Sequence, residues 1–254
     1  MDRNGRRAIK LPALTNEEPK ASASPSENLP FPDVPDKLVI AIDGWAQTGK
    51  NTTGALVAEY LGGVLVDSGR FYRALTLGCM EAGLQPFDQP AVAEWCKLAV
   101  IDVRLAKEDG TVPEAQVAVN GRCFTKAELA HLGLRVCAVA SIPEVRAIVK
   151  ACLRDCESLG RVVMLGRDIG GEIFPETPFK FFLNATEEVR EQRHFQSTGE
   201  MGSVKRDLYD ASNVMFSEDA LMIDTSRITP EKVCGLILVE VFWRSGELRK
   251  TNAG

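Results

Sequence analysis

Five short apolar runs constrain the fold of this chain more than any other feature. Each is five to eight residues long and made largely of apolar residues, and the first is rich in β-branched ones, which is typical of a strand buried on both faces of a sheet. Two helical patterns lie between them, and a glycine follows or ends each. Buried strands that alternate with helices predict a parallel α/β sheet. The runs are "KLVIAID" (37–43), "GVLVD" (63–67), "RVVMLGRD" (161–168), "FKFFLN" (179–184) and "ALMID" (220–224), and the helical patterns are "TTGALVAEYL" (52–61) and "IPEVRAIVKACLRDCESLG" (142–160).

Residues 97–122 follow a different pattern. Apolar and polar residues alternate in "KLAVIDVRLAKEDGTVPEAQVAVNG", and the stretch contains two turn-forming pairs, Asp109-Gly110 and Asn120-Gly121. Alternation of this kind is typical of strands with one face in water. We therefore expect a small antiparallel piece, inserted into the α/β body and exposed on one face.

The first 36 residues combine charge with repeated proline and serine, as in "ASASPSENLPFPDVPD". Too little apolar surface is present to offset the entropy lost on ordering, so a disordered tail is expected over 1–36. The remaining residues, 37–254, suffice for one compound domain. No apolar run approaches the roughly 20 residues needed to cross a bilayer, and no apolar stretch follows the basic residues at the start. We expect neither export nor a membrane anchor.

Charge and cysteine usage narrow the class of partner. The formal net charge is −5, which disfavours broad binding to nucleic acid but permits a local basic pocket for a small anion. The seven cysteines form no C-x-x-C pair, and His131 and His194 suggest no metal site. A protein of the reducing cytoplasm that acts on small molecules is the expectation.

The stretch "DGWAQTGKNT" (43–52) follows the first run and precedes a helical pattern. Its G-x-x-x-x-G-K spacing is that of a phosphate-binding loop, in which backbone amides and the helix N-terminus face phosphate oxygens and the lysine reaches the outer phosphates. The alternative is an ordinary glycine-containing turn. If Gln47 must be left-handed, the strain is about 1–2 kcal/mol. The residues expected to bind the donor nucleotide are Gly44, Trp45, Ala46, Gln47, Thr48, Gly49, Lys50, Asn51 and Thr52.

Charged and hydroxyl side chains follow two of the other runs. "LVDSGRFYRALTL" (65–77) places four such residues just past a strand, at the carboxyl edge where open α/β sheets bind ligands: Asp67, Ser68, Tyr72 and Arg73. Arg167 and Asp168 end another apolar run, where two charges are costly without partners. We favour a pocket over a surface position for these residues.

Taken in order, these segments resemble the bacterial cytidylate kinase family. The phosphate loop and "DSGRFYR" are joined downstream by "ASIPEVRAIV" (140–149), "LGRDIGGEIFPETPFKFFLNATEEVREQR" (165–193), "KRDLYDASN" (205–213) and "DALMIDTSRITPEKV" (219–233). Family members read approximately D-G-P-x-G-x-G-K, D-[ST]-G-x-x-Y-R, P-x-V-R, G-R-D-[IM]-G, F-L-x-A-x-x-x-x-R-x-x-R and R-D-x-x-D. The likeness extends from about residue 38 to 240.

The resemblance implies a P-loop NTPase fold of three α/β/α layers, with a parallel five-stranded sheet, a small antiparallel insert and a short lid. The core would cover 37–70 and 160–250, the nucleoside monophosphate-binding insert about 71–150, and the shortened lid about 190–206. The implied activity is ATP-dependent phosphorylation of CMP or dCMP by a monomer. ATP and Mg²⁺ are the implied cofactors.

The resemblance also implies a role for particular residues. Arg73, Arg167 and Arg206 would grip the acceptor phosphate through planar contacts. Asp210 would bind the ribose. The implied catalytic set is Lys50, Arg167, Arg190, Arg193 and Arg206; the implied acceptor-binding set is Ser68, Tyr72, Arg73, Cys137, Arg146, Arg167, Asp168, Arg206 and Asp210; and Thr52, with Asn51 nearby, would lie close to Mg²⁺.

Three positions differ from the family pattern, namely Cys137, His194 and Asn213. They keep two alternatives open: a catalytically weakened nucleotide-binding homologue with a regulatory role, and a kinase on the same scaffold with another small acceptor. Arg190 and Arg193 also follow Glu187 and Glu188 at helical spacing, which alone would fit a solvated face.

Overall fold

The computed structural model describes residues 34–107, 112–199 and 216–252 of the 254-residue chain. The predicted turn at Asp109 and Gly110 lies outside these ranges, and so do Arg206, Asp210 and Asn213. Most of the expected tail, residues 1–33, is likewise outside them.

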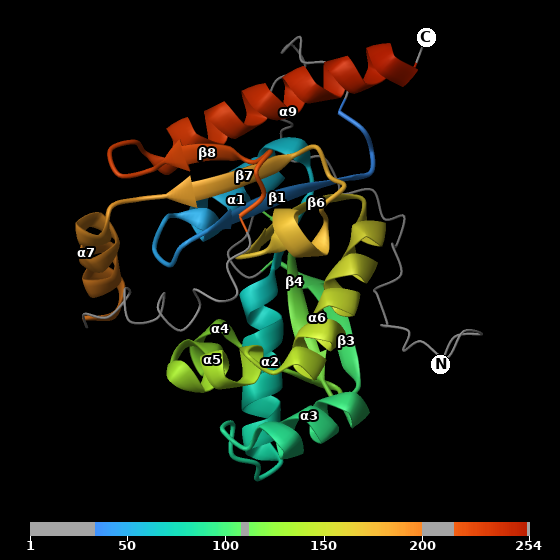
Figure 1. Cartoon of the computed structure of the whole chain (residues 1–254), viewed down its shortest axis with the longest axis vertical. Helices are drawn as coiled ribbons and strands as arrows, with labels where there is room; N and C mark the ends of the chain where they lie inside the picture. The colour runs from blue at the N-terminus through green and yellow to red at the C-terminus, as the bar shows by residue number, and fades with distance from the viewer. Residues whose placement is uncertain (1–33, 108–111, 200–215, 253–254) are drawn as a thin grey trace.

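All five predicted strands are present and form the parallel centre of one sheet (Figure 1). Every neighbouring pair among them is parallel, in the order β2-β6-β1-β7-β8. The first run of the sequence is therefore the middle strand. The strands are β1 (Leu38–Gly44), β2 (Val64–Asp67), β6 (Arg161–Gly166), β7 (Lys180–Asn184) and β8 (Leu221–Asp224).

The antiparallel insert is also present. It comprises β3 (Ile101–Ala106), β4 (Glu114–Val119) and β5 (Arg122–Cys123). Asn120 and Gly121 turn the chain with φ of 52° and 84°, as their sequence predicts. The pattern did not predict that β4 pairs in parallel with β2, through Leu65 and Glu114, so that the insert extends the main sheet.

The helices begin and end at residues suited to those positions. Gly62 ends α1 in a left-handed conformation, with φ of 59°. The side chain of Asp67 caps α2, and Thr125 with Glu128 forms a capping box at α4. The helical segments are α1 (Lys50–Leu61), α2 (Ser68–Glu81), α3 (Gln89–Leu98), α4 (Lys126–Ala130), α5 (Leu134–Ala140), α6 (Pro143–Asp155), η1 (Cys156–Leu159), η2 (Ile169–Ile173), α7 (Glu187–Thr198) and α9 (Pro230–Asn252).

Strand β1 divides the hydrophobic core into two layers. Val39 and Ala41 join a cluster that includes residues of α2, α3 and α6. Ile40 and Ile42 point the other way, into a cluster with residues of α1 and α9. Successive side chains of a strand face opposite sides, so a fully apolar strand can support helices on both faces. The expected three-layer architecture is confirmed.

The packed chain begins earlier than the sequence predicts. Val34 is buried in the α1 and α9 cluster, although the predicted tail includes it. Arg161 donates hydrogen bonds to the carbonyls of Val34 and Pro35 and pairs with Asp36 at 3.0 Å. Among the described residues, no helix is long and apolar enough to cross a membrane.

Candidate active site

The loop between β1 and α1 depends on two glycines and one strained residue. Gly44 has φ of 147°, and a Cβ there would lie 2.2 Å from the carbonyl oxygen of Leu183 on β7. Gly49 precedes α1 with φ of 90°. Gln47 is left-handed, with φ of 61°, so the strain considered for this position is present. The loop thus turns sharply enough to expose its amides at the start of α1.

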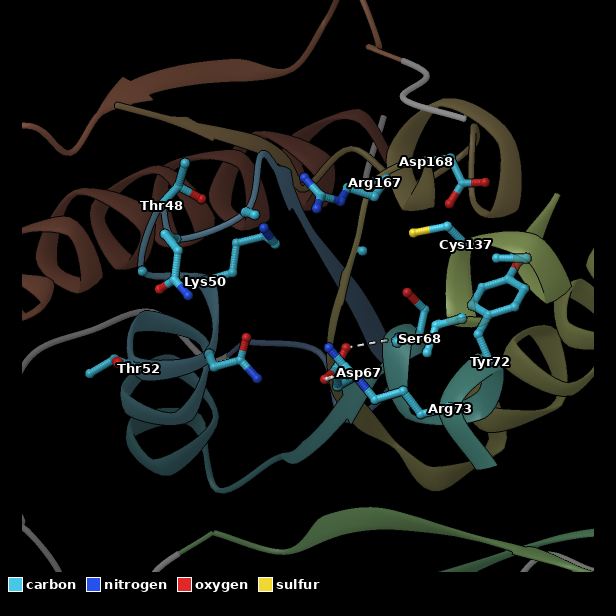
Figure 2. A pocket seen from close by; sticks show the side chains of 18 of the residues that line it. Thr48, Lys50, Thr52, Asp67, Ser68, Tyr72, Arg73, Cys137, Arg167 and Asp168 are labelled. Carbon is cyan, nitrogen blue, oxygen red and sulfur yellow. Dashed lines mark hydrogen bonds and ion pairs between the residues drawn. The ribbon is translucent and has the colours of Figure 1, made fainter. Parts of the chain in front are cut away.

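Two cations from different segments meet at the beginning of this loop. Lys50 donates to the carbonyl oxygens of Gly44 and Trp45, at 2.6 and 2.5 Å. Arg167, which follows β6, donates to the same Gly44 oxygen at 2.9 Å. Figure 2 shows the two side chains reaching toward each other beside the loop. Positive charge is therefore concentrated where β1 and β6 end.

A cavity of about 420 Å³ lies on the α2 side of the loop (Figure 2). It is formed where β1, β2 and β6 reach the carboxyl edge of the sheet, with α5 and α6 opposite. Every described residue that was predicted to bind the acceptor lines this cavity. These residues are Ser68, Tyr72, Arg73, Cys137, Arg146, Arg167 and Asp168.

The acidic groups of this cavity are held by cations or amides. Asp168 is almost fully buried and forms an ion pair with Arg146. Burial raises the pKa of Asp168, and the charge of Arg146 opposes that rise. Asp67 accepts from the amide of Gly69 at 2.9 Å and lies 3.7 Å from Arg73. Asp67 was expected at this edge of the sheet from the sequence, but no role in the site was predicted for it.

Tyr72 contributes a neutral polar group to the cavity. Its pKa is raised, mainly by burial. The phenol therefore keeps its proton at neutral pH and remains able to donate a hydrogen bond.

A second cavity of about 390 Å³ lies on the other side of the loop. Arg193 of α7 borders it and donates to the backbone oxygens of Gln47 and Thr225, at 3.2 and 2.7 Å. Thr225 in turn donates to the carbonyl of Thr48 at 3.0 Å. Seven of the lining residues were not predicted from the sequence, although Thr225 follows the last predicted strand at the carboxyl edge. They are Thr53, Gln196, Ser197, Thr225, Ile228, Pro230 and Val233.

Two predicted site residues point elsewhere. The ring of Trp45 packs edge-on against Phe182, with centroids 6.5 Å apart. Arg190 is 5% exposed and donates to the carbonyl of Ala185 at 3.2 Å. Burial lowers the pKa of Arg190, and the positive charge of Arg167 adds to the effect. Neither Trp45 nor Arg190 lines either of these two cavities.

A parallel sheet with a glycine loop and a lysine after its middle strand, and a cavity on each side of that loop, defines a P-loop phosphotransferase. The family model described as cytidylate kinase matches residues 40–242. The chain belongs to the cytidylate kinase family.

Curated relatives agree in both length and description. A cytidylate kinase of Herpetosiphon aurantiacus is 34% identical over 211 residues, which cover 78% of this chain and 92% of the relative. One of Chloroflexus aggregans is 34% identical, over 78% of this chain and 91% of that protein. One of Limosilactobacillus reuteri is 32% identical, over 77% and 91%.

Proposed function

We propose that this protein transfers the γ-phosphoryl group of ATP to CMP or dCMP. The observation that carries the proposal is the shared contact of Lys50 and Arg167 with the oxygen of Gly44. Lys50 belongs to the donor loop and Arg167 to the acceptor cavity, so the two phosphates would meet between these cations. Family membership supports the cytidine nucleotide as the acceptor.

On the donor side, the amides of the loop and Lys50 would bind the phosphates of ATP. The second cavity is large enough for part of a nucleoside, and its apolar wall of Ile228, Pro230 and Val233 suits a base. Arg193 connects the loop to the segment that precedes this wall, because it donates hydrogen bonds to the backbone oxygens of Gln47 and Thr225. It would keep α7 against the bound triphosphate.

On the acceptor side, Arg73 and Arg167 would hold the phosphate of CMP. Arg146 and Asp168, which form an ion pair, would present a donor and an acceptor to the cytosine edge. Asp210 and Arg206 remain proposals from the resemblance, for the ribose and for the phosphate.

The chemistry requires no protein base. The nucleophile is a phosphate oxygen, which already carries negative charge at neutral pH. The main barrier is the repulsion between two polyanions, and arginine and lysine lower it by positioning and neutralising them.

The residues at the start of α1 fit Mg²⁺, which prefers oxygen ligands and retains several waters. Asn51 and Thr52 are exposed, and both border a cavity with Asp67. No cluster of three His, Cys, Asp or Glu suited to a metal occurs in the described part of the chain. Mg²⁺ would sit mainly on the phosphates, neutralise their charge and take Thr52 as its protein ligand.

The domain division proposed for this function is a core of 37–70 and 160–250, an acceptor-binding insert of about 71–150 and a short lid of about 190–206. A monomeric cytoplasmic enzyme is proposed with it, and sedimentation of the purified protein tests the oligomeric state.

A coupled assay of ADP release tests the activity on a panel of acceptors that includes CMP, dCMP, UMP and AMP. Turnover with CMP or dCMP is expected, with a loss of at least about a hundredfold in Lys50→Ala. Lys97→Ala is the matched control, because Lys97 is an exposed lysine paired with Glu94 on α3. Turnover only with a different acceptor, or ATP binding without turnover, would contradict the proposal.

A further inference from the structure

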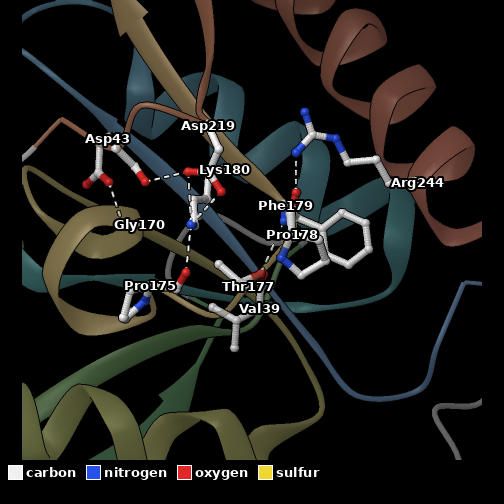
Figure 3. Close-up of polar contacts among 11 residues, drawn as sticks. Val39, Asp43, Gly170, Pro175, Thr177, Pro178, Phe179, Lys180, Asp219 and Arg244 are labelled. Atoms are coloured by element: carbon white, nitrogen blue, oxygen red, sulfur yellow. Dashed lines mark hydrogen bonds and ion pairs between the residues drawn. The ribbon is translucent and has the colours of Figure 1, made fainter. Parts of the chain in front are cut away.

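Asp43, at the end of β1, is a buried carboxylate that lines neither of the two cavities. It is 5% exposed. One of its oxygens accepts from the amide of Ile169 at 2.9 Å. The other accepts from the amide of Gly170 at 2.8 Å (Figure 3). These amides begin η2, directly after the two charged residues of the acceptor cavity.

These contacts join the acceptor segment to the first residues of the phosphate loop. Asp43 immediately precedes Gly44, and the oxygen of Gly44 accepts from Arg167. Residues 167–170 are therefore held at three points by two consecutive residues of β1. The position of the acceptor cations relative to the donor loop depends on this junction.

The electrostatics of Asp43 argue against a role in stability alone. Burial raises the pKa of Asp43 to about 7, although the two amides oppose the rise. The nearby charges also disagree, since Asp168 raises the pKa and Lys50 lowers it. An asparagine at this position would have the same shape and would not carry the cost of burying a charge, but its side-chain nitrogen cannot accept a hydrogen bond from a second N–H. Only a carboxylate can accept from both amides.

The far side of this junction is also packed. A Cβ on Gly170 would lie 3.1 Å from Cγ of Lys180, whose ammonium pairs with Asp219 at 2.8 Å (Figure 3). The start of η2 is thus held between a carboxylate and a lysine side chain, and its amides have little freedom to turn away.

We propose that Asp43 is a positioning residue for phosphoryl transfer: through two amide contacts it sets the distance from Arg167 and Asp168 to the phosphate loop. The proposal rests on the function proposed above. It adds a determinant of acceptor binding that touches neither nucleotide.

The test compares Asp43→Asn with a control variant, Thr177→Val, whose side chain contacts the opposite end of β1. Thr177 is buried and donates to the carbonyl of Val39 at 2.6 Å, so Thr177→Val also removes a buried polar contact of β1 (Figure 3). Asp43→Asn should raise the KM for CMP about tenfold and lower kcat, with the Kd for ATP alone changed by less than about twofold. Thr177→Val should lower Tm but leave the KM for CMP unchanged.

A pH profile separates positioning from general damage. In the wild type, kcat/KM for CMP should contain a step near neutral pH, because a protonated carboxyl serves two amides poorly. Asp43→Asn should lack that step while keeping any step that arises from the CMP phosphate. Equal profiles, or a KM unchanged by Asp43→Asn, would overturn the proposal.

Two further outcomes are decisive. If Asp43→Asn does not fold, amide exchange in the wild type replaces it: the amides of Ile169 and Gly170 should be protected, and exchange as fast as in exposed loops would overturn the proposal. If the wild type uses an acceptor other than CMP, the proposed function fails, and the Asp43 comparison is made with the KM for that acceptor.

Discussion

At the scale of single residues, Gln47 combines backbone strain with a contact between two segments. A left-handed conformation is costly for a residue with a side chain. The side-chain nitrogen Nε2 of Gln47 lies 3.3 Å from Nδ1 of His194, and the backbone carbonyl of Gln47 accepts a hydrogen bond from Arg193. The strained residue therefore connects the phosphate loop to α7.

Substitutions at Gln47 should separate the strain from the contact. Gln47→Gly removes both, and Gln47→Ala removes only the contact with His194. We expect the glycine variant to be more stable than the alanine variant by about 1 kcal/mol, which is a Tm difference of about 2–4 °C. Both should raise the KM for ATP to a similar extent. Thermal unfolding and ATP titration measure these effects, and equal Tm values would contradict the assignment of strain.

The raised pKa of Asp43 predicts how stability depends on pH. Its ordinary pKa is 3.8, and the folded value is about 7, so the folded state favours the protonated acid. The resulting stability is present at low pH and is lost as the pH rises through 7. From pH 6 to 8, the loss from this group should be about 1 kcal/mol. Urea unfolding at both pH values should show this loss in the wild type relative to Asp43→Asn; parallel changes in both proteins would refute it.

At the scale of elements, three ion pairs connect α6 to the segment that contains η2. Each acid lies 22 residues after its base, and successive pairs are four residues apart. The first pair belongs to the acceptor cavity, and the other two lie toward the surface. Sequence alone could not predict this arrangement: the three bases on α6 are like charges that cannot pair with one another, and no local pattern shows which element supplies their acids. The pairs are Arg146–Asp168, Lys150–Glu172 and Arg154–Glu176.

Because it is more buried, the first pair should contribute more to the free energy of unfolding than the second pair, Lys150–Glu172. The side chain of Asp168 is 9% exposed, whereas those of Lys150 and Glu172 are both 41% exposed. Arg146→Met leaves a buried acid unpaired and should lower the free energy of unfolding by about 1–3 kcal/mol. Lys150→Met, on the same helix face, should change it by less than about 1 kcal/mol. Urea unfolding of both variants checks this, and equal losses would be the contrary result.

At the scale of the whole molecule, the sequence predicted what depends on local pattern. Strand runs and glycines identified the sheet and the loop, and the rule that ligands bind at carboxyl edges gathered Arg73 with Arg167. The contacts of Asp43 were not predicted, since its amide partners lie 126 and 127 residues away. Thr225 was missed because its place beside the loop depends on the order of strands in the sheet, which no local pattern reveals.

Two truncations should locate the start of the packed chain. Removal of residues 1–33 should change Tm by less than about 2 °C, because their composition offers little apolar surface to bury. Removal of residues 1–37 also deletes the buried Val34 and three acceptors of Arg161, and should lower Tm by about 4 °C or more. Scanning calorimetry measures both, and equal Tm values would show that residues 34–37 do not contribute.

The crowding at Gly44 affects how changes in related chains should be interpreted. A Cβ at Gly44 would collide with the backbone of β7. A related protein with the same sheet would therefore keep this glycine even if it no longer bound a nucleotide. Around Gly49 no atom lies within 4 Å of the corresponding position, so only its backbone angle restrains it. Retention of the first glycine therefore reports an intact architecture, whereas retention of Lys50 is the better guide to surviving chemistry.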